Sequence, residues 1–252
     1  MSESRSPFPQ AYFAQLAEVE SSNWWFRSRN RTLLWVLRNK VGKFNNFLEV
    51  GCGTGYVLEG VRNEFPSLEM FGAEYHEEGL EFARSRIPTA NFRQLDVTKM
   101  TDTNRFDVIG AFDVIEHIEE DQKSLSNLAR AIKPHGRLIL SVPQHQWLWS
   151  HTDEAACHVR RYSSKDLENK LQRAGLKIEY KSSFVSLLVP LMFISRQRST
   201  KLEADPMSEL KTPKILNCLL ESIMKLELLL MKCGVKYPFG GSLLIVASRA
   251  ED

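Results

Sequence analysis

The chain has 252 residues, of which 43% are hydrophobic and 25% charged, so it can bury a sizeable core as one elaborated domain and requires no second domain. The formal net charge of +2 does not indicate nucleic acid as the main partner, because phosphate binding normally requires a clustered excess of basic residues. The four cysteines form no C-x-x-C pair, which indicates reduced thiols and a cytoplasmic location.

The N-terminal part of the sequence predicts a helical cap over residues 1–43. Residues 1–10 are polar and contain proline, so we expect no secretory signal there. Residues 10–40 have helical periodicity and many aromatic side chains. We expect the tryptophans of this cap to pack over a cleft, with Trp24 at the substrate and Arg27 or Arg31 pointing into the cleft.

A glycine-rich turn follows the cap. The apolar run over residues 47–50 predicts a strand that leads into Gly51, Gly53 and Gly55 and then into a helix over 56–63. Glycine is required where the backbone takes a positive φ or lies against a ligand, and the start of a helix offers unpaired N–H groups to negative charge. The segment therefore predicts a nucleotide-binding turn.

The spacing of the glycines discriminates between kinds of nucleotide. A dinucleotide-binding turn has the pattern G-x-G-x-x-G, and its third glycine is replaced here by Tyr56. NAD binding is therefore disfavoured. A disulfide at Cys52, inside the turn, would obstruct a ligand, which again favours a reduced thiol.

The next predicted strands also end in polar residues. A second apolar strand ends at Glu74, and an acid about 20 residues past such a turn usually accepts hydrogen bonds from ribose hydroxyls. Residues 91–97 read NFRQLDV, and the strand predicted over 106–112 ends in the sequence DVIEH at 113–117. A fifth strand is predicted over 136–143.

These segments together resemble class I S-adenosylmethionine-dependent methyltransferases. Residues 49–55 (EVGCGTG) are similar to the first motif of that family, 91–97 to its third motif, and 106–117 and 136–143 to its fourth and fifth strands. The resemblance implies S-adenosyl-L-methionine as the cofactor, with Asp96 accepting a hydrogen bond from the adenine amino group while Val97 packs on the ring. The predicted cofactor-binding residues are Glu49, Gly51, Cys52, Gly53, Gly55, Glu74, Tyr75, Asp96, Val97, Phe112 and Asp113.

Strands alternate with helical patterns at 56–63, 76–85 and 121–132, which predicts βαβ units. Ser163 caps a further helix that ends at Gly175, and strands follow over 176–180 and 242–248. We therefore predict an α/β fold with a doubly wound, mostly parallel, seven-stranded sheet of the Rossmann-like methyltransferase type. In that family the last strand inserts antiparallel beside the fifth. The predicted domains are the cap, a core over 44–183, a helical insertion over 184–240 and the last strand within 241–252.

Chemistry is expected at the carboxyl ends of the strands. Methyl transfer requires the acceptor atom to be held in line with the methyl carbon, and a hydroxyl or amine acceptor must also lose a proton. Our candidate bases are His117 and His151. Residues 113–117 resemble the strand tip of the ubiquinone/menaquinone-type O-methyltransferases, in which a histidine lies near the methyl group. A purely structural hydrogen-bonding role for His117 stays open.

The loop after the fifth strand contains the sequences WLWSHTD at 147–153 and HVRRY at 158–162, which also resemble that subgroup. We expect an apolar wall from a tryptophan and steering of an anionic group by an arginine. The substrate residues predicted in this loop are Trp149, Asp153, His158, Arg161 and Tyr162. Alternatively, Arg161 and Tyr162 simply tie the loop down. His151, Asp153 and His158 could in principle be metal ligands, although we expect no metal site.

The predicted insertion has two apolar segments. Residues 184–194 contain Pro190 and are too short to span a bilayer, which needs about 20 apolar residues. Residues 215–231 predict an amphipathic helix with a wide apolar face. Four interpretations stay open for this face: packing on the core, packing on a second subunit in a homodimer, a lid over an apolar acceptor, and a peripheral contact with the inner membrane face.

The sequence thus predicts a methyltransferase that acts on a small-molecule or lipid-like acceptor, with O-methylation favoured and no nucleic-acid partner. Two alternatives stay open. A non-catalytic S-adenosylmethionine-binding protein would not need His117 or the loop over 151–162. An NAD-dependent oxidoreductase would need the missing third glycine.

Overall fold

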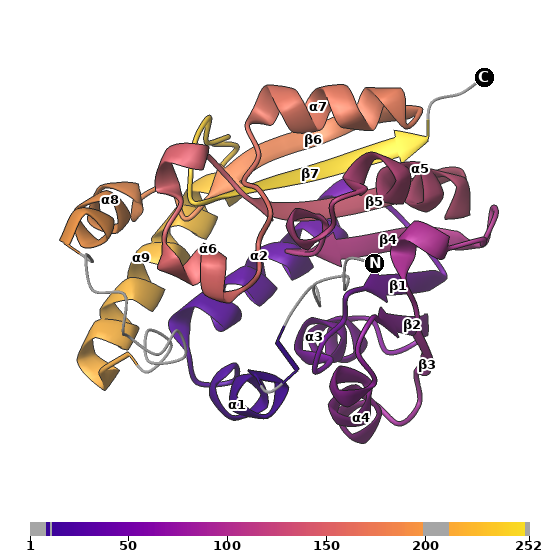
Figure 1. The fold of residues 1–252 in the computed structure, drawn as a ribbon, viewed down its shortest axis with the longest axis horizontal. Helices are drawn as coiled ribbons and strands as arrows, with labels where there is room; N and C mark the ends of the chain where they lie inside the picture. Colours follow the sequence, from indigo (N-terminus) through magenta and orange to yellow (C-terminus); the bar gives the residue numbers. More distant parts are fainter. Residues whose placement is uncertain (1–8, 11, 199–211, 250–252) are drawn as a thin grey trace, which may run out of the picture.

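The computed structural model describes residues 9–10, 12–198 and 212–249. Within them one seven-stranded sheet has the order β3-β2-β1-β4-β5-β7-β6 and runs through the centre of the molecule (Figure 1). Strands β1 to β5 are parallel, and β7 is antiparallel to both β5 and β6. The strands are β1 (Asn46–Val50), β2 (Glu69–Glu74), β3 (Asn91–Gln94), β4 (Phe106–Phe112), β5 (Ile132–Pro143), β6 (Leu176–Phe184) and β7 (Ser242–Arg249).

The predicted architecture is confirmed, including the antiparallel last strand beside the fifth. The described helices are α1 (Tyr12–Val19), α2 (Trp24–Lys40), α3 (Tyr56–Glu64), α4 (Glu77–Arg86), α5 (Asp121–Ala131), α6 (His151–Ala155), α7 (Ser164–Arg173), α8 (Val189–Arg198) and α9 (Lys214–Lys232). Three short 3₁₀ turns, η1 (Val97–Lys99), η2 (Ile115–His117) and η3 (Gln146–Leu148), follow strand ends. The Ser163 side chain accepts a hydrogen bond from Asp166 N and so caps α7 as predicted, while Gly175 takes a positive φ of 75° just past its end.

Helices cover both faces of the sheet. Alternate residues of each strand point to opposite faces, so Leu243 and Ile245 of β7 pack with α5 and α7, whereas Leu244 and Val246 pack with α2, α3 and α9. Both clusters are almost fully buried. This two-sided core fixes the strands whose carboxyl ends carry the predicted site.

The N-terminal cap and the insertion are joined by polar contacts between α2 and α9. The Asn217 side chain accepts a hydrogen bond from Trp24 N, and Glu221 forms ion pairs with Arg27 and with Arg31. Glu221 of α9 thus holds both guanidinium groups at the helix interface, and the expected place of Arg27 or Arg31 in the cleft stays a prediction. The division of the chain into cap, core and insertion stays a prediction.

One face of α9, in the predicted insertion, is buried and the other is exposed. The face of α9 toward α2 is buried through Leu220 and Met224, whereas Ile215, Leu219 and Leu226 remain exposed. No helix among the described residues is long and apolar enough to cross a bilayer. The expected absence of a secretory signal concerns residues 1–10, of which 1–8 lie outside the described residues.

Candidate functional site

The glycine turn between β1 and α3 has the predicted backbone geometry. Gly51, Gly53 and Gly55 have φ values of 67°, 51° and 80°. A Cβ on Gly51 would clash with Val114 at 2.4 Å, which places the turn against the tip of β4. A Cβ on Gly53 would meet only Phe13, at 3.8 Å, so the space above Gly53 is open beneath α1. A glycine is thus required at Gly51 for packing and at Gly53 for an open cradle.

Glu74 ends β2 beside this turn and is held by backbone amides. Its Oε2 accepts a hydrogen bond from Gly53 N at 2.9 Å, and its Oε1 accepts from Tyr75 N at 2.8 Å and His76 N at 3.2 Å. Burial raises the pKa of Glu74, and the hydrogen bonds from Gly53 and His76 partly offset this. The carboxylate is therefore positioned at the turn, where a ribose hydroxyl is expected to bind.

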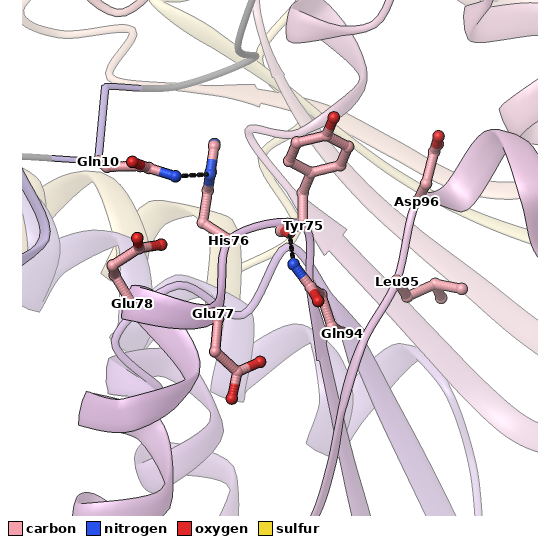
Figure 2. A pocket seen from close by; sticks show the side chains of 8 residues that line it. All are labelled: Gln10, Tyr75, His76, Glu77, Glu78, Gln94, Leu95 and Asp96. Atoms are coloured by element: carbon pink, nitrogen blue, oxygen red, sulfur yellow. Dashed lines mark hydrogen bonds between the residues drawn. The ribbon is translucent and has the colours of Figure 1, made fainter.

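A cavity of about 580 Å³ opens at the carboxyl ends of β2 and β3. Figure 2 shows His76 and Gln10 on one side of it and Leu95 and Asp96 on the other. The Gln10 amide lies 3.2 Å from His76 Nδ1, so Gln10 forms part of this rim. The lining residues are Gln10, Tyr75, His76, Glu77, Glu78, Gln94, Leu95 and Asp96. The cavity has the place expected for a nucleoside in this fold.

Asp96 is the acidic group on the β3 side of the cavity. Its side chain caps η1 by accepting hydrogen bonds from Thr98 N and Oγ1 and lies 3.1 Å from Lys99 Nζ. Burial favours protonation, but the hydrogen bonds from Thr98 and Lys99 prevail and lower the pKa of Asp96. Val97 belongs to the buried core and Phe112 turns back over Gly110, so neither faces this cavity.

Glu49 is a buried carboxyl next to the glycine turn. It is 3% exposed, and its Oε2 has no hydrogen-bond partner among the described residues. Burial raises the pKa of Glu49 to about 8, against the opposing charge of Arg29 and a hydrogen bond from the Leu58 backbone. Cys52 is also buried, and its Sγ lies against Gly72. A neutral Glu49 is thus available to ionise when a cation approaches.

The tip of β4 carries an ion pair that the sequence prediction missed. Asp113 has a positive φ of 57° and pairs with Arg29 of α2, and both side chains are mostly buried. The Arg29 guanidinium also stacks on Trp25, 4.6 Å from the ring centroid. The i, i+4 spacing of Trp25 and Arg29 is a signal for this stacking, but the partner Asp113 is distant in sequence.

Three side chains meet just beyond that tip. A carboxylate oxygen of Glu116 and one ring nitrogen each of His117 and His158 lie within 4.8 Å of one another. Glu116 is fully buried, and neither carboxylate oxygen has a partner among the described residues. Burial and the charge of Asp113 raise the pKa of Glu116 well above its usual range. This composition could hold a divalent metal, but it is not the set of His151, Asp153 and His158 weighed from the sequence.

Asp153 organises the loop over α6. Its carboxylate lies 2.8 Å from His158 Nδ1 and accepts two hydrogen bonds from Arg161, at 2.7 and 3.0 Å. Burial opposes ionisation, but the hydrogen bonds from His158 and Arg161 lower the pKa of Asp153 to about 2. Of the two interpretations of Arg161, this bidentate pair favours the one in which the residue ties the loop down.

The remaining loop residues divide between core and surface. Tyr162 is fully buried and donates to Asp121 Oδ2 at 2.8 Å, which again favours tying the loop down. The Trp149 ring nitrogen lies 3.4 Å from Glu154 Oε1, while Trp147 is exposed and contacts Phe193 of α8. His151 begins α6 and is not part of the three-residue group around Glu116 within the described chain. Its predicted role as a base stays a prediction.

The residues present fit an adenosylmethionine cofactor. The open cradle at Gly53 and the amide-bound carboxylate of Glu74 are in contact at the ends of β1 and β2, and the cavity at Asp96 opens at the ends of β2 and β3. Glu49, whose Oε2 has no hydrogen-bond partner among the described residues, belongs to β1 and lies two residues before Gly51. A positively charged ligand end suits this carboxyl, and a nucleoside suits the cavity.

The chain matches known proteins along most of this region. A family model described as a methyltransferase domain matches residues 22–181. A probable S-adenosylmethionine-dependent methyltransferase of Mycolicibacterium smegmatis is 25% identical over 64% of this chain and 62% of its own length. A ubiquinone biosynthesis O-methyltransferase of Coxiella burnetii is 29% identical over 39% of this chain and 44% of its own length.

The fold likeness extends further than the sequence likeness. The putative methyltransferase solved in complex with the Haloferax volcanii Trm112 methyltransferase activator superposes with a TM-score of 0.65 at 18% identity, and the match covers 96% of this chain and 97% of that one. The family match, the glycine turn and the sheet order agree with one another. The chain therefore belongs to the class I S-adenosylmethionine-dependent methyltransferases, as its motifs predicted.

Proposed function

We propose that this chain transfers a methyl group from S-adenosylmethionine to an oxygen of a small or lipid-like acceptor. The observation that carries the proposal is the group of buried Glu116 and half-buried His117 and His158, which lies beyond the β4 tip that packs on the glycine turn. Histidines near a carboxyl can take the proton that a hydroxyl must lose. The Coxiella burnetii relative is an O-methyltransferase, which supports oxygen as the methylated atom.

When bound, S-adenosylmethionine supplies the electrophilic methyl carbon. The chain's contribution is to hold the nucleoside end at Glu74 and Asp96 and to leave room for the reacting end above Gly53. Helix α1 covers this cradle, because Phe13 is 4% exposed and lies over Gly53 and Gly79. Exclusion of water and alignment of the acceptor are the main requirements of such a transfer.

An apolar acceptor is favoured by the surface next to the loop after β5. Trp147 of η3 contacts Phe193 of α8, with ring centroids 6.0 Å apart. Leu191, Phe193 and Ile194 of α8 are all exposed. Apolar side chains gathered on a surface commonly mark a contact with ligand, partner or membrane. We propose that α8 and η3 receive the apolar part of the acceptor.

The test is transfer of label from methyl-labelled S-adenosylmethionine to a panel of phenols, alcohols, carboxylic acids and amines, each with a short and a long alkyl chain. We expect a labelled ether from a hydroxyl acceptor, with greater turnover for the longer chain. Calorimetry with S-adenosylhomocysteine and with NADH should show binding of the first ligand only. Label transfer restricted to amines would contradict the proposal.

A further inference from the structure

We propose that His158 is the general base of this site and that Asp153 is its positioning residue, so that the acceptor is a neutral hydroxyl rather than a carboxylate. This inference rests on the proposed methyl transfer to oxygen. It differs from the sequence prediction, in which His117 and His151 were the candidate bases and Asp153 and His158 lined the acceptor site.

Asp153 is held rigidly in one orientation. Its side chain is fully buried, and Oδ2 accepts hydrogen bonds from Ser150 N at 2.9 Å and from Arg161 at 3.0 Å. The second Arg161 nitrogen donates to Oδ1 at 2.7 Å. Both oxygens are thus fixed by donors from two sides of the loop, and the carboxylate can offer His158 only an acceptor.

This contact decides which tautomer His158 adopts. Its Nδ1 lies 2.8 Å from Asp153 Oδ1, and an ionised carboxylate accepts but does not donate, so Nδ1 carries the hydrogen. The lone pair of the neutral ring is then on Nε2. The backbone holds the ring in place, because His158 N donates to Asp153 O and Val159 N donates to Glu116 O, at 2.9 and 2.8 Å. The loop is thereby fastened to the tip of β4.

The surroundings of His158 indicate what it acts on. The ring is edge-on to His117, with centroids 4.7 Å apart, and close to the unpartnered carboxyl of Glu116. A buried carboxyl without a partner costs free energy, which a hydroxyl ligand bound there would recover. Arg29 and Arg161, the two arginines whose charge acts on Glu116, are already paired with Asp113 and Asp153. A carboxylate acceptor would have to compete with Asp113 and Asp153 for these two arginines, whereas a neutral hydroxyl would not.

The proposed step balances as follows. An oxygen lone pair of the acceptor forms the new O–CH₃ bond, and the bond between the methyl carbon and sulfur breaks with its electron pair left on the sulfur. The hydroxyl proton passes to His158 Nε2, and the resulting imidazolium is stabilised by Asp153 at Nδ1. The imidazolium then releases its proton to solvent.

The first measurement is the tautomer of His158, read from the ring ¹⁵N shifts of the cofactor-free protein and assigned with the variant His158→Gln. At a pH where the ring is neutral, we expect hydrogen on Nδ1 in the wild type. In Asp153→Asn the amide can donate to Nδ1, so the hydrogen should move to Nε2. A wild-type ring with its hydrogen on Nε2 would overturn the inference without any measurement of activity.

The second measurement is turnover. His158→Gln should keep the affinity for S-adenosylhomocysteine within about threefold and lose about 10²–10⁴-fold in turnover of a hydroxyl acceptor. The matched control is His135→Gln, at an exposed position between α5 and the rest of β5, which should keep full turnover. Asp153→Asn should also lose turnover. If that variant fails to fold, the His158→Gln result decides.

Three outcomes would overturn the base assignment: full turnover in His158→Gln, wild-type transfer to carboxylic acids in place of hydroxyls, and loss of turnover on chelation with recovery on adding a divalent cation. The last would make the ring nitrogen a metal ligand. Failure of the proposed function would look different, because the wild type would then bind S-adenosylhomocysteine and methylate no oxygen acceptor in the panel.

Discussion

Glu49 should make the stability of the cofactor-free protein fall as the pH rises through neutrality. Burial raises its pKa from 4.5 to about 8, so between these values the folded chain keeps a proton that the unfolded chain has released. The folded state then binds more protons, and the stability contribution present below pH 4.5 is lost as the pH approaches 8. At 1.36 kcal/mol per pH unit, the loss by pH 7 is about 3 kcal/mol.

The variant Glu49→Gln replaces the titrating carboxyl with a neutral group of the same shape. We expect its free energy of unfolding to match that of the wild type near pH 4.5 and to exceed it by about 1–3 kcal/mol at pH 7. The lower end of this range reflects the amide atom at the position of Oε2, which stays without a partner and costs free energy. The assay is urea unfolding of the cofactor-free proteins at four pH values from 4.5 to 8. Glu69→Gln, an exposed carboxyl at the start of the neighbouring β2, is the matched control and should parallel the wild type. Parallel curves for Glu49→Gln and the wild type would refute the reasoning.

Four further outcomes are expected. Glu74→Gln should weaken S-adenosylhomocysteine binding about 30-fold in calorimetry, the loss of about 2 kcal/mol for a charge-assisted hydrogen bond, while the exposed cavity residue Glu78→Gln should stay within twofold. Gly53→Leu should abolish that binding because its side chain fills the open cradle, with circular dichroism unchanged. Asp153→Asn should cost about 2 kcal/mol of stability above pH 4 and little near pH 2, as measured by urea unfolding. The pKa of Asp153 is lowered from 3.8 to about 2 in the folded state, so its ionised carboxylate stabilises the fold above pH 3.8, and this stabilisation is lost as the pH falls toward 2. Glu221→Gln should lower the free energy of unfolding by about 1 kcal/mol or less, because the ion pairs of Glu221 with Arg27 and Arg31 are partly exposed. The same variant should speed hydrogen exchange in α2, and unchanged exchange there would argue against a joined cap and insertion.

The sequence was most informative where function depends on local backbone geometry. The glycine turn, the end of β2 at Glu74, the place of Asp96 just after β3 and the cap at Ser163 each depend on a few consecutive residues, and the structure has them where the pattern predicted. The antiparallel position of the last strand beside the fifth followed from the family resemblance. The exact start of β5 did not, because Ile132 begins a strand where helical periodicity appeared to continue.

Contacts between distant elements could not be predicted in the same way. Arg27 and Arg31 were expected at the cleft because they belong to a cap thought to cover it, whereas their partner Glu221 lies far along the chain in α9. Arg29 was passed over, although it is the arginine of this run that reaches the β4 tip. Residues two apart on a helix point in different directions, so Arg27 and Arg31 lie at the interface with α9 while Arg29 between them reaches the β4 tip.

Because α2 and α9 are in contact, deleting the insertion cannot by itself test whether it acts as a lid. Removing residues 187–232 would delete Glu221 together with the Asn217 side chain that accepts from Trp24 N, and would expose Leu33, Val36 and Leu37 of α2 where they pack with Leu220 and Met224. Loss of activity after such a deletion would not distinguish a lid from a structural layer. Substitution of exposed α8 residues tests the lid directly, because Leu191 and Phe193 are exposed.

The charges around the strand tips suit a cationic cofactor. Glu49, Glu74, Asp113 and Glu116 gather at the ends of β1, β2 and β4, and Arg29 is the arginine whose charge acts on both Glu49 and Glu116. A sulfonium near these groups favours ionisation of the buried carboxyls, whereas the product, a neutral thioether, removes that charge. Methyl transfer therefore weakens the interaction between the site and its own product, which favours exchange of S-adenosylhomocysteine for a new cofactor molecule. We expect S-adenosylmethionine to bind more tightly than S-adenosylhomocysteine in the wild type, and this preference to shrink in Glu49→Gln.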